Sequence, residues 1–184
     1  PYIEVSGKGI EKLKAAGIEV ELGLCAEEGR NLNKRFFTFQ EKKRPWVLLK
    51  WAQTYEGFIG PDQHLNPDLY AQNRPISSEE SKYLIHKWRA EEDAILVGYR
   101  TVLLDDPLLD ARYYNNKILT RMVFDPKGAL KAEGRFFRPE GKVLVFNHFM
   151  DKVENNIEWI RVGGRNPYAE ILAKAFERNI QSVM

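Results

Sequence analysis

The fold is decided by residues 94–112, which read AILVGYRTVLLDDPLLDAR. The first four residues form an apolar run typical of a strand covered on both faces, and Gly98 ends it. The residues after Gly98 predict a short helix with the hydroxyl of Thr101 near its start. A helix N-terminus at the carboxyl end of a buried strand is where α/β proteins bind phosphate groups. A turn without any ligand explains the same residues, and spacing alone favours that interpretation, because the G-x-G-x-x-G fingerprint is absent.

Strands and helices alternate on both sides of this stretch, which predicts a three-layer α/β fold with a mostly parallel central sheet. Residues 77–91 predict the clearest helix, with Ser77 and Glu80 as a capping box. Its expected buried stripe is Leu84, Ile85 and Trp88. A second helix is expected over 166–178, and a loop over 58–75. The other predicted strands are 46–52, 120–124, 142–147, 157–162 and 180–184.

The first 43 residues follow a different pattern and predict a separate domain remnant. Apolar spacing indicates a helix near residues 10–16, a strand over 18–22, and a helix with Leu32, Phe36 and Phe37 on one side. The charged run at 41–45 ends in proline, so we expect one domain over 1–43 and another over 44–184. The chain starts in loop-like sequence and stops within a strand pattern, which suggests a piece of a longer protein.

Composition excludes several classes of function. The 184 residues carry a net charge of +2, with both signs interspersed, so we expect no nucleic-acid partner. No apolar run approaches the ~20 residues that span a bilayer, so no membrane association is expected. Cys25 is the single cysteine, which suits a reducing cytoplasm. The three histidines are scattered, so no metal site is expected.

Four features are candidates for a binding site, each with a structural alternative. Arg89 and Arg112 flank residues 98–106, and a planar guanidinium suits phosphate, although Arg89 also complements a helix dipole. Asp105-Asp106-Pro107 either ends a helix or holds a ribose hydroxyl. Lys50 interrupts an apolar run, so its ammonium either reaches a site or extends to solvent.

Taken together, these segments resemble the reductase domain of the bifunctional riboflavin-biosynthesis deaminase–reductase family. The resemblance rests on RPWVLLKWAQTYEGFIG, ISSEESKYLIHKWRAEEDAILVGYRTVLLDDPLLDAR and TRMVFDPKG. It implies a dihydrofolate-reductase-like fold from about residue 45, and NADPH as cofactor. The implied substrate is a phosphorylated ribosylamino-pyrimidine, 5-amino-6-(5-phosphoribosylamino)uracil, whose ribosyl group is reduced to ribityl by hydride delivery to C1′. The N-terminal VSGKGIEKLKAAGIEVELGL is similar to the end of the family's cytidine-deaminase-like domain. Members of the family form homo-oligomers, which is therefore implied here.

The resemblance also assigns residues to roles. Lys50 and Asp105 are implied near the reacting ribose as catalytic groups. Cofactor contacts are implied for Ala52, Pro75, Thr101, Asp105 and Pro126. Substrate contacts are implied for Asn73, Arg89, Leu109 and Arg112.

Three departures from the family pattern matter. Residues 73–77 read NRPIS where the family often has Ser-x-Trp-Ile-Thr. The deaminase motif, His-x-Glu with Pro-Cys-x-x-Cys, is absent, so zinc is expected only in a deaminase part outside this chain. The family's Val-Glu-Gly-Gly turn would begin after Met184, so we expect weak or absent turnover from residues 1–184 alone. Two alternatives stay open: another dihydrofolate-reductase-like pterin or folate reductase, and a non-catalytic nucleotide-binding module.

Overall fold

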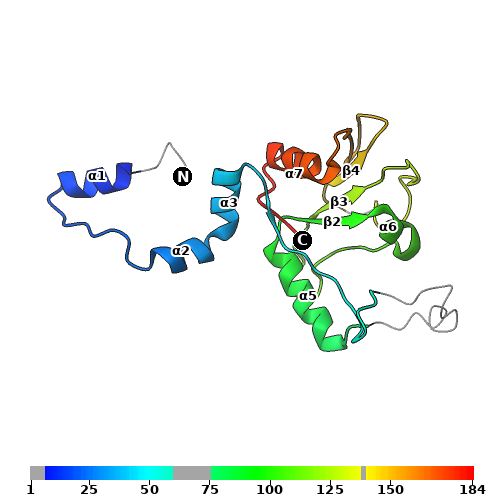
Figure 1. Ribbon diagram of the computed structural model, residues 1–184, viewed down its shortest axis with the longest axis horizontal. Helices are drawn as coiled ribbons and strands as arrows, with labels where there is room; N and C mark the ends of the chain where they lie inside the picture. The colour runs from blue at the N-terminus through cyan, green and yellow to red at the C-terminus, as the bar shows by residue number, and fades with distance from the viewer. Residues whose placement is uncertain (1–6, 60–75, 138–139) are drawn as a thin grey trace. The chain divides into compact units, whose positions relative to one another are not determined.

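The computed structural model describes residues 7–59, 76–137 and 140–184 (Figure 1). The chain forms two compact units: one joins the chain up to Trp46 with residues 164–182, and the other joins residues 47–163 with 183–184. The elements, in order, are α1 (Lys8–Ala15), α2 (Ala26–Leu32), α3 (Lys34–Lys42), β1 (Trp46–Val47), α5 (Glu79–Glu91), β2 (Ala94–Gly98), α6 (Tyr99–Asp105), β3 (Thr120–Phe124), β4 (Val143–Asn147), β5 (Lys152–Glu154), β6 (Ile157–Arg161), α7 (Pro167–Glu177) and β7 (Ser182–Val183).

The strands form one sheet in the order β1-β7-β2-β3-β4-β6-β5. β2, β3, β4 and β6 run parallel, with Leu96 beside Met122 and Met122 beside Leu144, while β5 pairs antiparallel with β6. All five residues of β4 are buried, which explains the apolar run of its first four residues, Val143 to Phe146. The predicted α/β fold with a mostly parallel sheet is confirmed.

Two predicted strands are corrected. The strand expected over 46–52 is only Trp46–Val47, followed by a hydrogen bond from the Leu48 N–H to the Val183 carbonyl at 2.8 Å. Leu49 and Trp51 are then 75% and 58% exposed, so the apolar run is not buried as a strand. Residues 18–22 form no strand, because no described strand lies beside them to accept their backbone hydrogen bonds.

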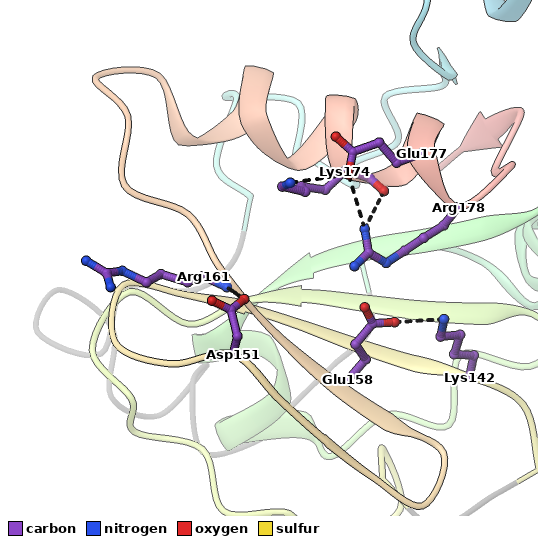
Figure 2. Close-up of polar contacts among 7 residues, drawn as sticks. All are labelled: Lys142, Asp151, Glu158, Arg161, Lys174, Glu177 and Arg178. Atoms are coloured by element: carbon purple, nitrogen blue, oxygen red, sulfur yellow. Dashed lines mark hydrogen bonds and ion pairs between the residues drawn. The ribbon is translucent and has the colours of Figure 1, made fainter.

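β5 was not predicted. Its three residues are charged or exposed, and it lies at the edge of the sheet, so it lacks an apolar signal. Asn155, with a positive φ of 54°, makes the tight connection to β6. Two further polar contacts hold this region (Figure 2). Lys142 forms an ion pair with Glu158 at 2.7 Å, and the Arg161 N–H donates to the Asp151 carboxylate at 2.8 Å.

The N-cap of α5 lies one residue later than predicted. Ser78, not Ser77, is the N-cap, and its hydroxyl accepts from the Ser81 N–H at 3.3 Å. Its fully buried residues are His86 and Ala90, whereas Leu84 of the predicted stripe is 44% exposed. The inner face is shifted because the His86 ring packs against Tyr113, with centroids 4.6 Å apart.

In the other unit, α3 and α7 contribute the buried residues. The rings of Phe39 and Phe176 lie 4.6 Å apart, and Ile171 and Ala175 are fully buried. Asn166 caps α7 by accepting from the Ala169 N–H at 3.1 Å. Leu32 ends α2 and is 82% exposed, so the predicted stripe of Leu32, Phe36 and Phe37 is wrong at that residue, which a separate short helix carries.

The α7 helix ends in a small charged cluster, which Figure 2 labels. Glu177 pairs with Lys174 at 3.2 Å and lies 3.9 Å from Arg178. The Arg178 guanidinium also donates to the Lys174 carbonyl at 2.8 Å, which satisfies one of the last carbonyls of the helix. None of the described helices combines the length and apolar content that crossing a bilayer requires.

Candidate functional site

A pocket of about 210 Å³ lies where α5 ends and the segment after α6 begins. Two residues of that segment, Asp106 and Leu109, have positive φ angles of 39° and 52°, so the backbone turns sharply here. The pocket is lined by Arg89, Asp105, Pro107, Leu108, Leu109, Arg112 and Arg135. Four of the residues that the sequence suggested as site residues therefore meet in one cavity, although they come from different parts of the chain.

Arg89 is a half-buried guanidinium with a neutral partner. Its Nη1 donates to the Asp110 carbonyl at 3.2 Å. Within the described part of the chain it forms no ion pair with a carboxylate at 4.0 Å or less. Burial lowers the pKa of Arg89; the negative Asp110 opposes this shift, and the positive Arg112 adds to it. A half-buried charge held in this way is stabilised by an anion entering the pocket.

Arg112 is held by a carboxylate. Its Nη1 donates to Oδ2 of Asp110 at 2.9 Å, and its guanidinium lies 5.5 Å from the centroid of the Tyr113 ring. Asp110 thus supports both arginines, Arg89 through its carbonyl and Arg112 through its side chain.

Lys50 is an exposed residue close to Arg89. Burial of part of its side chain, followed by repulsion from Arg89, lowers the pKa of Lys50. The structure thus brings a third positive charge near Arg89. Lys50 and Asp105 form no hydrogen bond or ion pair with each other or with any other described residue.

The adjacent aspartates do different things. Asp105 is exposed, lines the pocket and ends α6. Asp106, whose side chain is partly exposed, binds the loop that carries Arg135: its two carboxylate oxygens accept from the backbone N–H groups of Arg135 at 2.8 Å and Phe136 at 2.9 Å. The sequence offered ending a helix or binding a ligand for the pair: in the structure Asp106 is the C-cap residue of α6, and the ligand role of Asp105, which lines the pocket, stays a prediction.

Two of the expected cofactor residues, Thr101 and Pro126, follow the ends of strands β2 and β3. Gly98 ends β2, with φ −75° and ψ 154°, and a Cβ atom added there would meet nothing within 4 Å. Thr101 is half-buried in the first turn of α6, whose N-cap residue is Gly98 and which has no side-chain cap. Pro126 is half-buried after β3, beside Asp125, whose carboxylate accepts from the N–H groups of Ala129 at 3.1 Å and Leu130 at 2.9 Å.

Ala52 is the remaining described site residue, and it does not line the pocket. Ala52 is half-buried in the segment after β1. Asn73 and Pro75 lie outside the described residues. No group of three or more His, Cys, Asp or Glu side chains within the described ranges is arranged to hold a metal ion.

Sequence reasoning missed Arg135 and the structural roles of Asp106, Asp110 and His86. Arg135 lines the pocket from the loop between β3 and β4. The glycine before it, Gly134, with φ +92°, marks a turn there, but no spacing rule connects that turn with the pocket.

Known proteins share this sequence and architecture. A family model described as the RibD C-terminal domain matches residues 45–184. The riboflavin biosynthesis protein RibD of Aquifex aeolicus is 44% identical over 124 residues, 67% of this chain and 33% of that protein. The RibD of Buchnera aphidicola is 32% identical over 172 residues, 85% of this chain and 44% of that protein.

A solved structure from Thermotoga maritima, a diaminohydroxyphosphoribosylaminopyrimidine deaminase/5-amino-6-(5-phosphoribosylamino)uracil reductase, superposes with a TM-score of 0.81 at 32% identity. The match covers 98% of this chain and 49% of that chain. The riboflavin biosynthesis reductase of Saccharomyces cerevisiae shares the fold, with a TM-score of 0.58 at 19% identity, over 84% of this chain and 70% of that one. This chain spans about a third to a half of the length of its RibD relatives.

The mostly parallel sheet, together with the superposition on the Thermotoga maritima structure, defines an α/β protein with the dihydrofolate-reductase-like fold. Within that class, the chain belongs to the family of the RibD C-terminal domain.

Proposed function

We propose that this chain carries the NADPH-dependent reductase activity of riboflavin biosynthesis, reducing the ribosyl group of 5-amino-6-(5-phosphoribosylamino)uracil to ribityl. Membership of the RibD C-terminal domain family and the reductase named for the Thermotoga maritima structure support this reaction. The observation that carries the proposal is the pocket in which Arg89 and Arg112 meet Asp105 and Leu109.

The charges of the pocket favour a phosphorylated substrate. Arg112 is matched by Asp110, but Arg89 has only a carbonyl partner among the described residues, and Lys50 lies near it. A phosphate dianion would supply the negative charge that Arg89 lacks, through the charge-assisted hydrogen bonds that guanidinium groups form with phosphate oxygens. We assign Arg89 and Arg112 to the 5′-phosphate, with Leu109 and Asn73 as neighbouring substrate contacts.

The residues near the carboxyl end of β2 fit a nicotinamide cofactor. The backbone of Gly98 is in a conformation open to any residue, and the space over its Cα is empty, so the glycine leaves room for a ligand against the backbone. Thr101, Asp105, Ala52, Pro75 and Pro126 would hold NADPH. The bound cofactor supplies the hydride that reduces C1′ of the ribosyl group.

Opening the ribose ring also requires a proton at the ring oxygen. Lys50 is our candidate for orienting or polarising this centre: its lowered pKa makes the Nζ ammonium a stronger acid than that of an ordinary lysine. Asp105, exposed at the pocket, would accept hydrogen bonds from the ribose hydroxyls and so orient the sugar.

We further propose that residues 1–43 are the last part of a deaminase-like domain and that the reductase domain starts at residue 44. The extent of the similarity to the Thermotoga maritima deaminase/reductase, 98% of this chain, supports that assignment. A zinc site then belongs to the deaminase part, and homo-oligomer formation, a cytoplasmic location and the absence of nucleic-acid and membrane partners stay predictions.

One assay separates the three candidate functions. NADPH oxidation by the purified protein is measured with 5-amino-6-(5-phosphoribosylamino)uracil and, separately, with dihydrofolate. Any turnover is expected with the uracil alone. Turnover of dihydrofolate alone would identify a folate reductase instead. NADPH binding without turnover of either would favour a non-catalytic nucleotide-binding module.

A further inference from the structure

Arg135 reaches the pocket from a loop that is held rigidly on both sides. Before it, Gly134 has φ +92°, and a Cβ there would lie 2.7 Å from Oδ1 of Asp106, so only glycine allows the loop to approach so closely. After it, the Phe136 side chain is fully buried. The Arg121 guanidinium donates to the Phe136 carbonyl at 2.7 Å, which fixes the loop from the sheet side.

Asp106 then sets the direction of the Arg135 side chain. Its carboxylate accepts a hydrogen bond from the Arg135 backbone N–H, and its backbone carbonyl accepts one from Nε of Arg135 at 3.0 Å. Nε of Arg135 also lies 3.9 Å from Oδ2 of Asp106. Within the described residues, both Nη groups of Arg135 remain without a hydrogen bond, and the side chain lines the same pocket as Arg89 and Arg112.

We propose that Arg135 is a third guanidinium for the substrate phosphate, and that Asp106 is the positioning residue that presents it. This inference rests on the proposed function, because it takes the phosphate of the ribosylamino-pyrimidine as the ligand. A guanidinium whose Nε is already bound keeps two Nη groups for two phosphate oxygens. The positive charge of Arg135, added to those of Arg89 and Arg112, makes the pocket selective for a dianion over a neutral hydroxymethyl group.

The test compares the phosphorylated substrate with its dephosphorylated riboside in Arg135→Gln. We expect the KM for the phosphorylated substrate to rise about tenfold to a hundredfold, as loss of a charge-assisted hydrogen bond implies. The KM for NADPH and for the riboside should stay within about twofold. Arg161→Gln is the matched control: Arg161 is exposed, and its side chain forms no hydrogen bond or ion pair among the described residues (Figure 2). An Arg135→Gln variant that behaves like Arg161→Gln overturns the inference.

Asp106→Asn tests the positioning role. The substitution leaves the backbone carbonyl that accepts from Nε of Arg135, but it weakens the carboxylate's hold on the Arg135 backbone N–H, so it should raise the same KM. It should add little when combined with Arg135→Gln, because both changes act on one guanidinium–phosphate contact. A combined effect equal to the product of the two separate effects would show that Asp106 acts independently of Arg135.

Calorimetric titration with ribose 5-phosphate and with ribose separates this inference from the proposed function. Binding of ribose 5-phosphate that weakens in Arg135→Gln, without turnover of the uracil substrate, would keep the arginine assignment and reject the reaction. Turnover of the uracil substrate, with ribose 5-phosphate binding unchanged in Arg135→Gln, would keep the reaction and reject the arginine assignment. If the protein neither binds ribose 5-phosphate nor turns over the uracil substrate, both the arginine assignment and the proposed reaction are overturned.

Discussion

Nδ1 of His86 lies 3.9 Å from Oδ1 of Asp110, and neither atom has a hydrogen-bond partner among the described residues. His86 is only 5% exposed, on the inner face of α5. Asp110 is the residue that holds Arg89 and Arg112 in the pocket, so His86 stands directly behind the site. A buried pair with neither atom hydrogen-bonded is sensitive to any change in its charge.

Protonation of His86 should therefore weaken the fold in mild acid. Burial, followed by repulsion from Arg89, lowers the pKa of His86 below its ordinary value of 6.5. The folded protein then binds fewer protons than the unfolded chain between these two pKa values. The free energy of unfolding is at its full value above pH 6.5 and falls as the pH drops toward the lower, folded-state pKa.

Urea unfolding across this pH range checks the prediction. His86→Phe keeps an aromatic ring against Tyr113 but cannot titrate, so its unfolding free energy should vary less with pH than that of the wild type. Equal slopes in the two proteins would assign the pH dependence to other groups.

Asp105 and Asp106 are adjacent residues with different contacts, so the stability of their alanine variants can be compared directly. Asp106→Ala removes the acceptor of two backbone N–H groups, so we expect a loss of about 1–3 kcal/mol in the free energy of unfolding. Asp105→Ala removes an exposed side chain without hydrogen bonds in the described residues and should change stability by less than about 0.5 kcal/mol.

Activity should separate the same two variants in another way. Asp105→Ala should lower kcat/KM for the uracil substrate at nearly unchanged stability, because Asp105 is assigned to ribose and cofactor. Urea unfolding measures the stability of both variants, and steady-state kinetics measures their kcat/KM. A stability loss in Asp105→Ala as large as that in Asp106→Ala would contradict the division of roles.

Gly98 provides a test of the cofactor site. Alanine fits its φ and ψ and meets no atom within 4 Å, so Gly98→Ala should fold with unchanged stability. The added methyl group would occupy space assigned to NADPH, and the Kd for NADPH should rise about tenfold. Fluorescence titration measures the Kd, with Gly163→Ala as control, because that glycine also has open space around its Cα. Equal NADPH affinity in Gly98→Ala and the wild type would place the cofactor elsewhere.

The central strands could be predicted because full burial leaves a continuous apolar sequence. β2, β3 and β4 match their predicted ranges to within a residue, whereas β5, an exposed edge strand of three residues, leaves no such pattern. The error at 46–52 has the opposite cause: Leu49 and Trp51 are apolar but exposed, and periodicity alone does not distinguish them from buried residues.

Four of the seven residues that line the pocket were expected from the sequence, and the distance along the chain explains why Arg135 was not. Arg89 and Arg112 flank the 98–106 segment, so their charges indicate an anion site near it. Asp106 and Arg135 are separated by 29 residues, and their contact depends on a glycine turn and on how β3 and β4 pair. No local pattern encodes such a contact.

The assignment of the pocket to the substrate phosphate depends most on Arg89, because Arg89 is the half-buried charge that the phosphate would neutralise. Replacing it with glutamine removes a charge that has only a carbonyl partner in the described residues, so the free energy of unfolding should stay the same or rise by up to about 1 kcal/mol. A thermal melt shows whether any loss of activity in Arg89→Gln comes from unfolding.

The decisive measurement is the ratio of kcat/KM for 5-amino-6-(5-phosphoribosylamino)uracil to kcat/KM for its dephosphorylated riboside, in the wild type, Arg89→Gln and Arg161→Gln. We predict a wild-type preference of about a hundredfold or more for the phosphorylated compound, matched by Arg161→Gln and reduced at least tenfold in Arg89→Gln. An equal preference in the wild type and Arg89→Gln would contradict the assignment of this pocket to the substrate phosphate.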